Sequence, residues 1–142
     1  MMKKISTLIL GLILTLSLNA QSINSEQLAG TWKVINGTTT SELPAEVGRM
    51  MLLMLDGFDT STWSFNSDGT FNIKFKENLS PIMEEMKFLD NKLWKIDEPT
   101  KQIRIGTKSD NYGHLVMTNQ LQGDNLKVVF SDTPIYLLLE KQ

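Results

Sequence analysis

The sequence predicts a mainly β fold: an eight-stranded antiparallel up-and-down barrel with one or two short helices. Apolar and polar residues alternate in eight short segments, as they do in half-buried strands. Turn sequences such as Asp68-Gly69 separate these segments, and only two stretches show helical spacing. Sequential strands with short turns favour a meander, and closure of the meander removes its exposed edges.

The first 20 residues have the layout of a secretory signal peptide. Lys3 and Lys4 precede an apolar run over residues 5–18, and the small residue Ala20 follows. The run is too short for a comfortable membrane span. We therefore expect cleavage after Ala20, an exported protein that is periplasmic or extracellular, and no integral membrane segment afterwards. Residues 21–142 then form a single domain.

The net charge limits the possible partners, and the cysteine content limits how the fold can be stabilised. Without Lys3 and Lys4, 12 basic residues face 16 acidic ones, a net charge of about −4. Nucleic acids and anionic membrane surfaces require clustered lysine and arginine, so we expect no nucleic-acid partner. The sequence contains no cysteine, so the apolar core alone must stabilise the exported fold.

The first half of the domain alternates between strand and helix patterns. In residues 28–35, Gly30, Trp32 and Val34 share one face, and the polar residues 36–41 indicate a turn. Residues 43–58 have helical spacing, with an apolar segment at Met50–Leu55 that requires cover on more than one side. Residues 62–65 and 71–76 then form a hairpin around the Asp-Gly turn.

The second half consists mostly of strands. Ser80 and Pro81 indicate the start of a second short helix within residues 78–89. The remaining strands are predicted at residues 94–97, 103–105, 114–121, 126–130 and 135–140, with polar turns between them.

These features resemble the lipocalins. Gly30-Thr31-Trp32 on the first strand looks like their G-x-W signature. The segments 63–70 and 93–96 are similar to the small lipocalin-like domains that Bacteroidetes-type bacteria export. The resemblance covers roughly residues 28–140 and implies a ligand-binding barrel whose structural signature is formed by Gly30, Trp32, Trp63 and Trp94. Lipocalins place an arginine over the signature tryptophan, and here the equivalent cation would be Lys141 or Arg104.

Each tryptophan has two interpretations, ligand stacking or core packing, and core packing is favoured because each ring buries a large area. The methionines are more suggestive of a binding site, since their flexible side chains adapt to irregular apolar shapes. We expect a helical lid over an apolar ligand; the alternative is a helix that plugs the barrel. The candidate ligand-binding residues are Met50, Met51, Met54, Phe58, Met83, Met86 and Met117.

No catalytic group is evident. His114 is the single histidine, which excludes a multi-histidine metal site, and no nucleophile motif accompanies it. Glu84 and Glu85 are adjacent on a helix and diverge, so they do not form an acid–base pair. The sequence therefore predicts a non-catalytic binding module for a small, mostly apolar ligand, with no metal or cofactor. The alternative is a filled barrel that binds another envelope protein through its surface.

Overall fold

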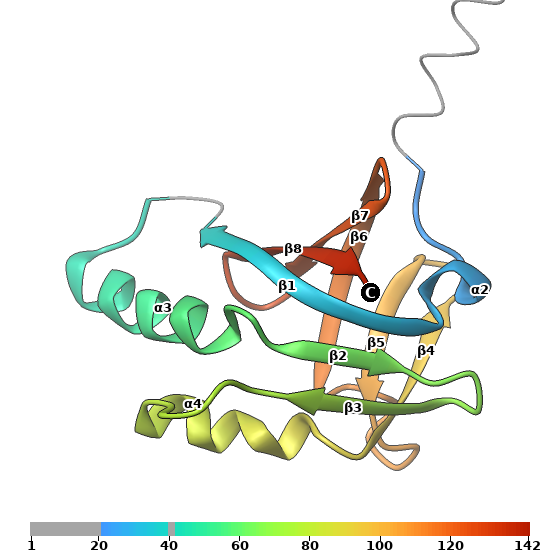
Figure 1. Ribbon diagram of the computed structural model, residues 1–142, viewed down its shortest axis with the longest axis horizontal. Coiled ribbons are helices and arrows are strands. Elements are labelled where there is room, and N and C mark those ends of the chain that lie inside the picture. Colours follow the sequence, from blue (N-terminus) through green and yellow to red (C-terminus); the bar gives the residue numbers. More distant parts are fainter. Residues whose placement is uncertain (1–20, 40–41) are drawn as a thin grey trace, which may run out of the picture.

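The computed structural model describes residues 21–39 and 42–142 and confirms the predicted barrel. Eight antiparallel strands follow one another in sequence and close into a barrel, with β1 paired to both β2 and β8 (Figure 1). The strands are β1 Gly30–Thr39, β2 Thr62–Phe65, β3 Thr70–Lys74, β4 Lys92–Asp97, β5 Gln102–Gly106, β6 Leu115–Gln122, β7 Asn125–Phe130 and β8 Ile135–Lys141. The predicted signal peptide lies outside the described residues.

The first strand is longer than the sequence predicts. The polar segment 36–41 was expected to be a turn, but β1 continues to Thr39, so the prediction is wrong for residues 36–39. β8 is the reason: Asn36–Thr39 pair with Leu138–Ile135, and this pairing overrides the local turn preference of Asn-Gly. A bulge between Val34 and Asn36 bends the strand where this second half begins.

β1 also extends beyond its other neighbour. Its pairing with β2 covers only Gly30–Lys33. Two further backbone bonds involve Val34, whose N–H donates to the carbonyl of Ser61 at 3.0 Å and whose carbonyl accepts from Thr60 at 3.2 Å. Past Val34, no described strand pairs with β1 on this side.

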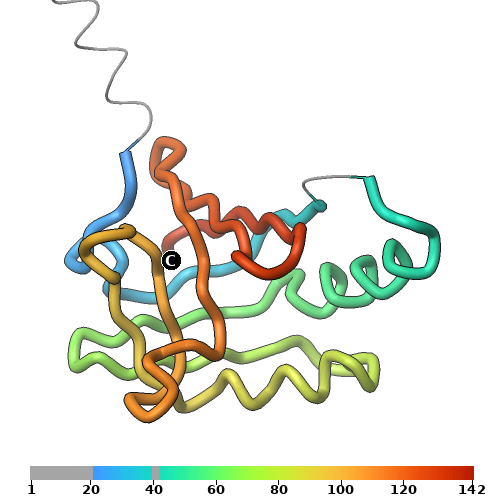
Figure 2. Tube along the Cα trace, turned by 180° about the vertical axis from the view of Figure 1, so that it is seen from behind, coloured from blue at the N-terminus to red at the C-terminus, as the bar shows by residue number. Residues whose placement is uncertain are grey.

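Helix α3 (Ala45–Phe58) follows β1 in the chain and confirms the predicted helix. Met51 and Phe58 are buried in the core, with Met54 and Leu55 packed against it. The second predicted helix divides into a short α-helix, α4 (Pro81–Glu84), and a 3₁₀-helix, η2 (Glu85–Leu89). Figures 1 and 2 show α3 and α4 at the same end of the barrel from opposite sides.

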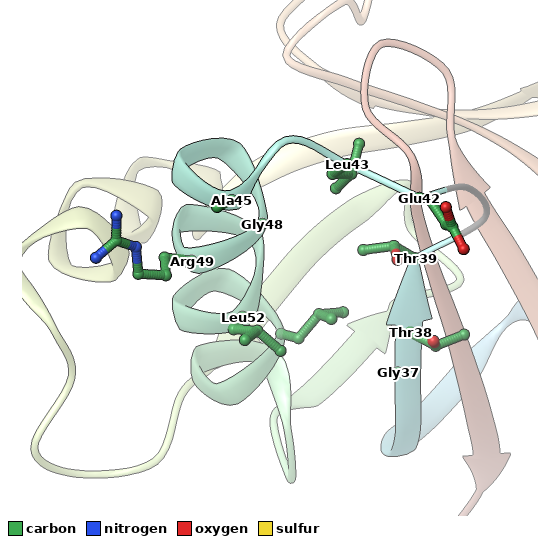
Figure 3. Close-up of a pocket in the computed structure, with 10 residues that line it drawn as sticks. Gly37, Thr38, Thr39, Glu42, Leu43, Ala45, Gly48, Arg49 and Leu52 are labelled. Carbon is green, nitrogen blue, oxygen red and sulfur yellow. The ribbon is translucent and has the colours of Figure 1, made fainter.

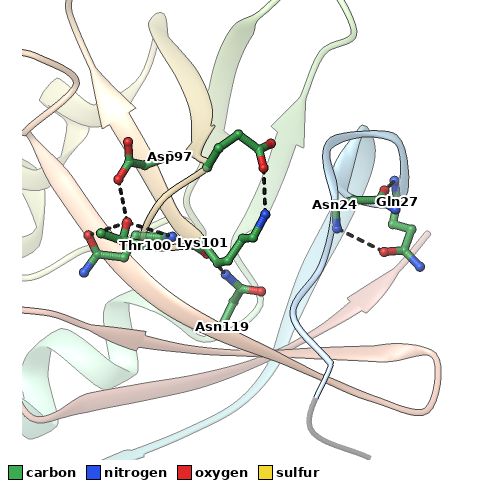
Figure 4. Close-up of polar contacts among 8 residues, drawn as sticks. Asn24, Gln27, Asp97, Thr100, Lys101 and Asn119 are labelled. Atoms are coloured by element: carbon green, nitrogen blue, oxygen red, sulfur yellow. Dashed lines mark hydrogen bonds and ion pairs between the residues drawn. The ribbon is translucent and has the colours of Figure 1, made fainter. Parts of the chain in front are cut away.

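Helix α2 (Ser25–Leu28) precedes the barrel and is not predicted by the sequence pattern. A capping box begins this helix, with Asn24 and Gln27 each accepting from the other's backbone N–H (Figure 4). Asn119 on β6 holds the same segment: its Oδ1 accepts from the N–H of Ile23 and its Nδ2 donates to the carbonyl of Lys101, each at 2.8 Å. The segment before the barrel is therefore joined through Asn119 to β6 and to the turn before β5.

The barrel interior is filled by side chains. A continuous run of aromatic rings crosses it, with centroids 6.1 Å apart for Phe58–Trp63, 5.9 Å for Trp63–Phe71, 5.0 Å for Phe71–Phe65 and 5.5 Å for Phe65–Trp94. Tilted and edge-to-face arrangements at these separations are the favourable ones for aromatic pairs. A barrel of eight strands is narrow enough for its own side chains to fill it.

Trp32 closes the end of the barrel near α2. It is 2 % exposed, and its Nε1 donates to the carbonyl of Leu28 at 2.8 Å. Of the two cations proposed from the sequence, Lys141 is the one that lies over the ring, with Nζ 5.4 Å from the centroid. The Lys141 ammonium also donates to the carbonyl of Gln27 at 2.9 Å, so it joins β8 to α2.

Candidate functional site

An open groove of about 610 Å³ lies between α3 and the second half of β1 (Figure 3). Two walls and a connecting segment form it. The residues that line it are Gly37, Thr38 and Thr39 from β1, Glu42 and Leu43 from the connection, and Ala45, Gly48, Arg49, Leu52 and Leu55 from α3.

The groove exists because β1 extends to Thr39, whereas its pairing with β2 covers only Gly30–Lys33. A second hollow of about 350 Å³ shares Gly37, Leu52 and Leu55 with the first and adds Ile35 and Asn36 from β1. The two hollows together follow β1 from Ile35 to Thr39, where β1 has β8 on one side only. The groove therefore runs along an exposed strand edge.

Leucines form the helical wall. Leu52 is 65 % exposed, the largest fraction among the exposed large apolar side chains of the described residues. Leu55, three residues on, packs closely over β1, because a Cβ added at Gly37 would lie 3.1 Å from Leu55 Cδ2. Glycine at position 37 thus lets the helix approach the strand, while Leu52 stays uncovered.

Carboxylates flank the groove. Glu42 lies at one end, and Asp56 and Asp59 at the other. Asp56 forms an exposed ion pair with Lys76 at 3.0 Å. The side chain of Arg49 points away from β1 in Figure 3, so the rim is acidic on balance.

The methionines proposed from the sequence lie elsewhere. Met51, Phe58, Met83 and Met117 are buried in the core, and Met54 and Met86 pack against it. Met50 is exposed, but it lies on another face of α3. Because it is two residues before Leu52, its side chain is rotated by about 200° around the helix axis from that of Leu52. None of the seven lines the two hollows of the groove. Their role in ligand binding stays a prediction.

The signature residues have structural contacts. Trp63 and Trp94 donate from Nε1 to Ser61 Oγ and to the carbonyl of Asn66, each at 2.9 Å, as Trp32 does to Leu28. Gly30 adopts φ +135°, and an added Cβ would lie 3.0 Å from Lys141 Cε. Each of these residues therefore contacts other parts of the fold itself.

The groove residues were not recognised from sequence. Leu52 and Leu55 belong to the same apolar segment as the methionines, and a helix that is apolar all round does not reveal which face stays open. To identify the open face, one must know how far β1 extends. The Asn36-Gly37 sequence predicted a turn there, so the length of β1 was not predicted.

The one histidine belongs to a loop between β5 and β6. His114 Nε2 lies 2.8 Å from Asp110 Oδ2, and its ring packs edge-on against Phe88 at 5.4 Å. Burial alone would raise the pKa of Asp110, but hydrogen bonds from Thr107 and Gly113 and the charge of His114 outweigh it, and the pKa is lowered. Asp110 thus accepts bonds that shape its own loop.

Within 21–39 and 42–142, no group of three or more histidine, cysteine, aspartate or glutamate side chains converges as a metal site would require. In the same residues, no helix is long and apolar enough to cross a membrane.

No protein-family model matches the chain, and neither does any curated protein sequence. Among solved structures, a DUF4847 family protein from Bacteroides vulgatus is similar at 16 % sequence identity. The match covers 81 % of this chain and 95 % of that protein, with a TM-score of 0.43.

Proposed function

We propose that this protein is an exported, non-catalytic binding module of the lipocalin-like type, whose ligand is small and mostly apolar. The ligand occupies the groove between α3 and β1, because the barrel interior is filled. The observation that carries the proposal is Leu52, 65 % exposed in the wall of a groove that also contains Leu43 and Leu55. Large apolar side chains gathered in a groove are typical of binding sites.

The energy available is adequate for useful affinity. Covering an exposed leucine side chain contributes about 1.5–3 kcal/mol. Leu52 and the partly exposed Leu43 and Leu55 line one continuous surface. A ligand that covers them and gains polar contacts with β1 can reach micromolar affinity, which corresponds to about −8 kcal/mol.

Two adjacent leucines give a matched test. Leu52 lines the groove, whereas Leu53 is 48 % exposed on another face of the same helix. A neutral apolar dye, Nile red, should bind the mature protein with a blue-shifted emission. Leu52→Glu should abolish this binding and Leu53→Glu should leave it intact. Equal binding by both variants, or no binding by the wild type, would contradict the proposal.

Export is the second part of the proposal. Lys3 and Lys4, the apolar run and Ala20 support a cleaved signal. N-terminal sequencing of the exported protein should begin at or within a few residues of Gln21. Recovery of the full-length chain in the membrane fraction would contradict this expectation.

A surface-binding interaction protein is the second candidate, favoured by a different observation. The face of α3 away from the groove carries Val47, Met50 and Leu53, each between 42 % and 48 % exposed. If this face binds an envelope protein, capture of that protein from the host envelope should be lost with Leu53→Glu and retained with Leu52→Glu. The reverse pattern would assign binding to the groove.

A further inference from the structure

We infer that the ligand of the α3–β1 groove is an extended peptide segment, which adds a strand to the free edge of β1. The inference rests on the proposed function in taking this groove as the binding site, and it names the chemical class of the ligand. Three features carry it: the direction of the β1 backbone groups, the length of the groove and its charge.

The backbone direction follows from the hydrogen bonds on either side of β1. In an antiparallel ladder, alternate residues turn their N–H and C=O toward the same neighbour. The backbone groups of Thr31 point toward β8, since its carbonyl accepts from the N–H of Gln142 at 2.9 Å. Those of Val34 point toward the β2 side, where they bond to Ser61 and Thr60. The bulge adds one residue and so shifts the alternation: beyond it, Asn36 and Thr38 are the residues whose N–H and C=O groups turn toward β8.

Gly37 and Thr39 consequently turn their backbone groups toward the groove. The N–H of Gly37 donates at 2.8 Å to the side-chain Oδ1 of its exposed neighbour Asn36. A side-chain amide is readily displaced by a ligand carbonyl. Both residues line the groove, and no described strand takes up their outward groups. Such an edge is a template for strand addition.

The groove has the dimensions of a short strand. From Ile35 to Thr39 it follows five residues of β1. At about 3.3 Å per residue this is roughly 16 Å, the length of a peptide of four or five residues. In an added strand, alternate side chains would point toward Leu52 and Leu55, so an apolar residue at every second position suits the leucine wall.

Charge distinguishes a peptide from other apolar ligands. Glu42 lies at one end of the groove and Asp59 at the other, and neither forms an ion pair within the described residues. The acidic rim opposes the carboxylate of a fatty acid and attracts a cation. The occupant we infer is therefore an extended peptide with alternating apolar residues between basic ends.

The test uses the mature protein and the synthetic peptide acetyl-Lys-Val-Thr-Val-Thr-Val-Lys-amide, titrated by calorimetry. Two analogues replace backbone amides by esters, which removes N–H donors without adding bulk. One carries the esters at the valine positions and the other at the threonine positions. Because only one set of amides faces β1, we expect one analogue to lose at least tenfold in affinity and the other to bind like the parent. A peptide with glutamates in place of both lysines should bind more weakly than the parent, and this difference should shrink at high salt.

The outcomes separate this inference from the proposed function. If Nile red binds and responds to Leu52→Glu, but the peptide fails to bind or both ester analogues bind like the parent, the inference is overturned and the proposed function stands. If neither the dye nor the peptide binds, both are overturned. A dimer in sedimentation that Leu52→Glu converts to a monomer, with no peptide binding, would assign the edge to a second copy of the chain and also overturn the inference.

Discussion

Alanine in place of either of two glycines in α3 should change the stability of the protein in opposite directions. Gly48 and Gly57 both have helical neighbours on either side, so alanine at either position removes conformational freedom from the unfolded chain. In a helix interior this stabilises by about 0.5–1 kcal/mol. At Gly48 an added Cβ would meet nothing within 4 Å, so Gly48→Ala should show this gain.

At Gly57 the added methyl would collide with α4. It would lie 2.7 Å from Met83 Cε and 2.9 Å from Sδ, and closer still to Cγ. Methionine is flexible, but Met83 is fully buried and has little room to withdraw. Overpacking of a buried site costs about 1–3 kcal/mol. After the helical gain is subtracted, Gly57→Ala should destabilise the protein by up to about 2.5 kcal/mol.

Urea denaturation followed by tryptophan fluorescence measures both effects. The midpoint should rise for Gly48→Ala and fall for Gly57→Ala, with unchanged slopes. Shortening the neighbour, in Gly57→Ala/Met83→Ala, should show a favourable coupling of roughly 0.5–3 kcal/mol relative to the two single variants. Equal stability of the two glycine variants would refute the close packing of α3 on α4.

Three further predictions concern the ends of the barrel and its response to acid. Trp32→Ala should destabilise by about 3–5 kcal/mol in the same denaturation assay, the usual cost of deleting a buried aromatic ring; a loss below about 1 kcal/mol would contradict its burial. Lys141→Met should cost roughly 0.5–1 kcal/mol in wild type, through the cation over the ring, and much less in the Trp32→Ala background. Hydrogen bonds from the hydroxyl and N–H of Thr70 lower the pKa of Asp68 below its ordinary 3.8. The ionised carboxylate therefore stabilises the folded state above pH 3.8. This contribution is lost as the pH falls through the lower pKa of the folded state. Asp68→Asn should therefore flatten the acid limb of a stability–pH curve, and an unchanged limb would contradict the assignment.

The sequence was informative about the barrel because its signals are local. Period-two alternation and the Asp68-Gly69 turn identified the hairpin that the structure shows as β2 and β3. The helical spacing of residues 43–58 likewise identified α3 to within two residues. Neither pattern depends on distant parts of the chain.

The groove was inaccessible to the same reasoning because it depends on non-local pairing. Asn36-Gly37 has turn composition, and only the distant strand β8 makes it part of β1. Without that extension, no strand edge faces α3. The sequence then gives no basis for deciding whether the Met50 face or the Leu52 face of the helix borders a groove. The short helix α2 was missed for a related reason, because its four residues are too few for a periodic signal.

The central claim is that the apolar ligand binds between α3 and β1. A two-dimensional amide NMR titration of the mature protein with Nile red tests it most directly, because each backbone amide reports its own surroundings. The claim predicts that the largest shift changes fall on Gly37, Thr39, Leu43 and Leu52, with Val47 and Phe88 unmoved. Largest changes at Val47, Met50 or Phe88, or uniform changes throughout the barrel strands, would contradict it.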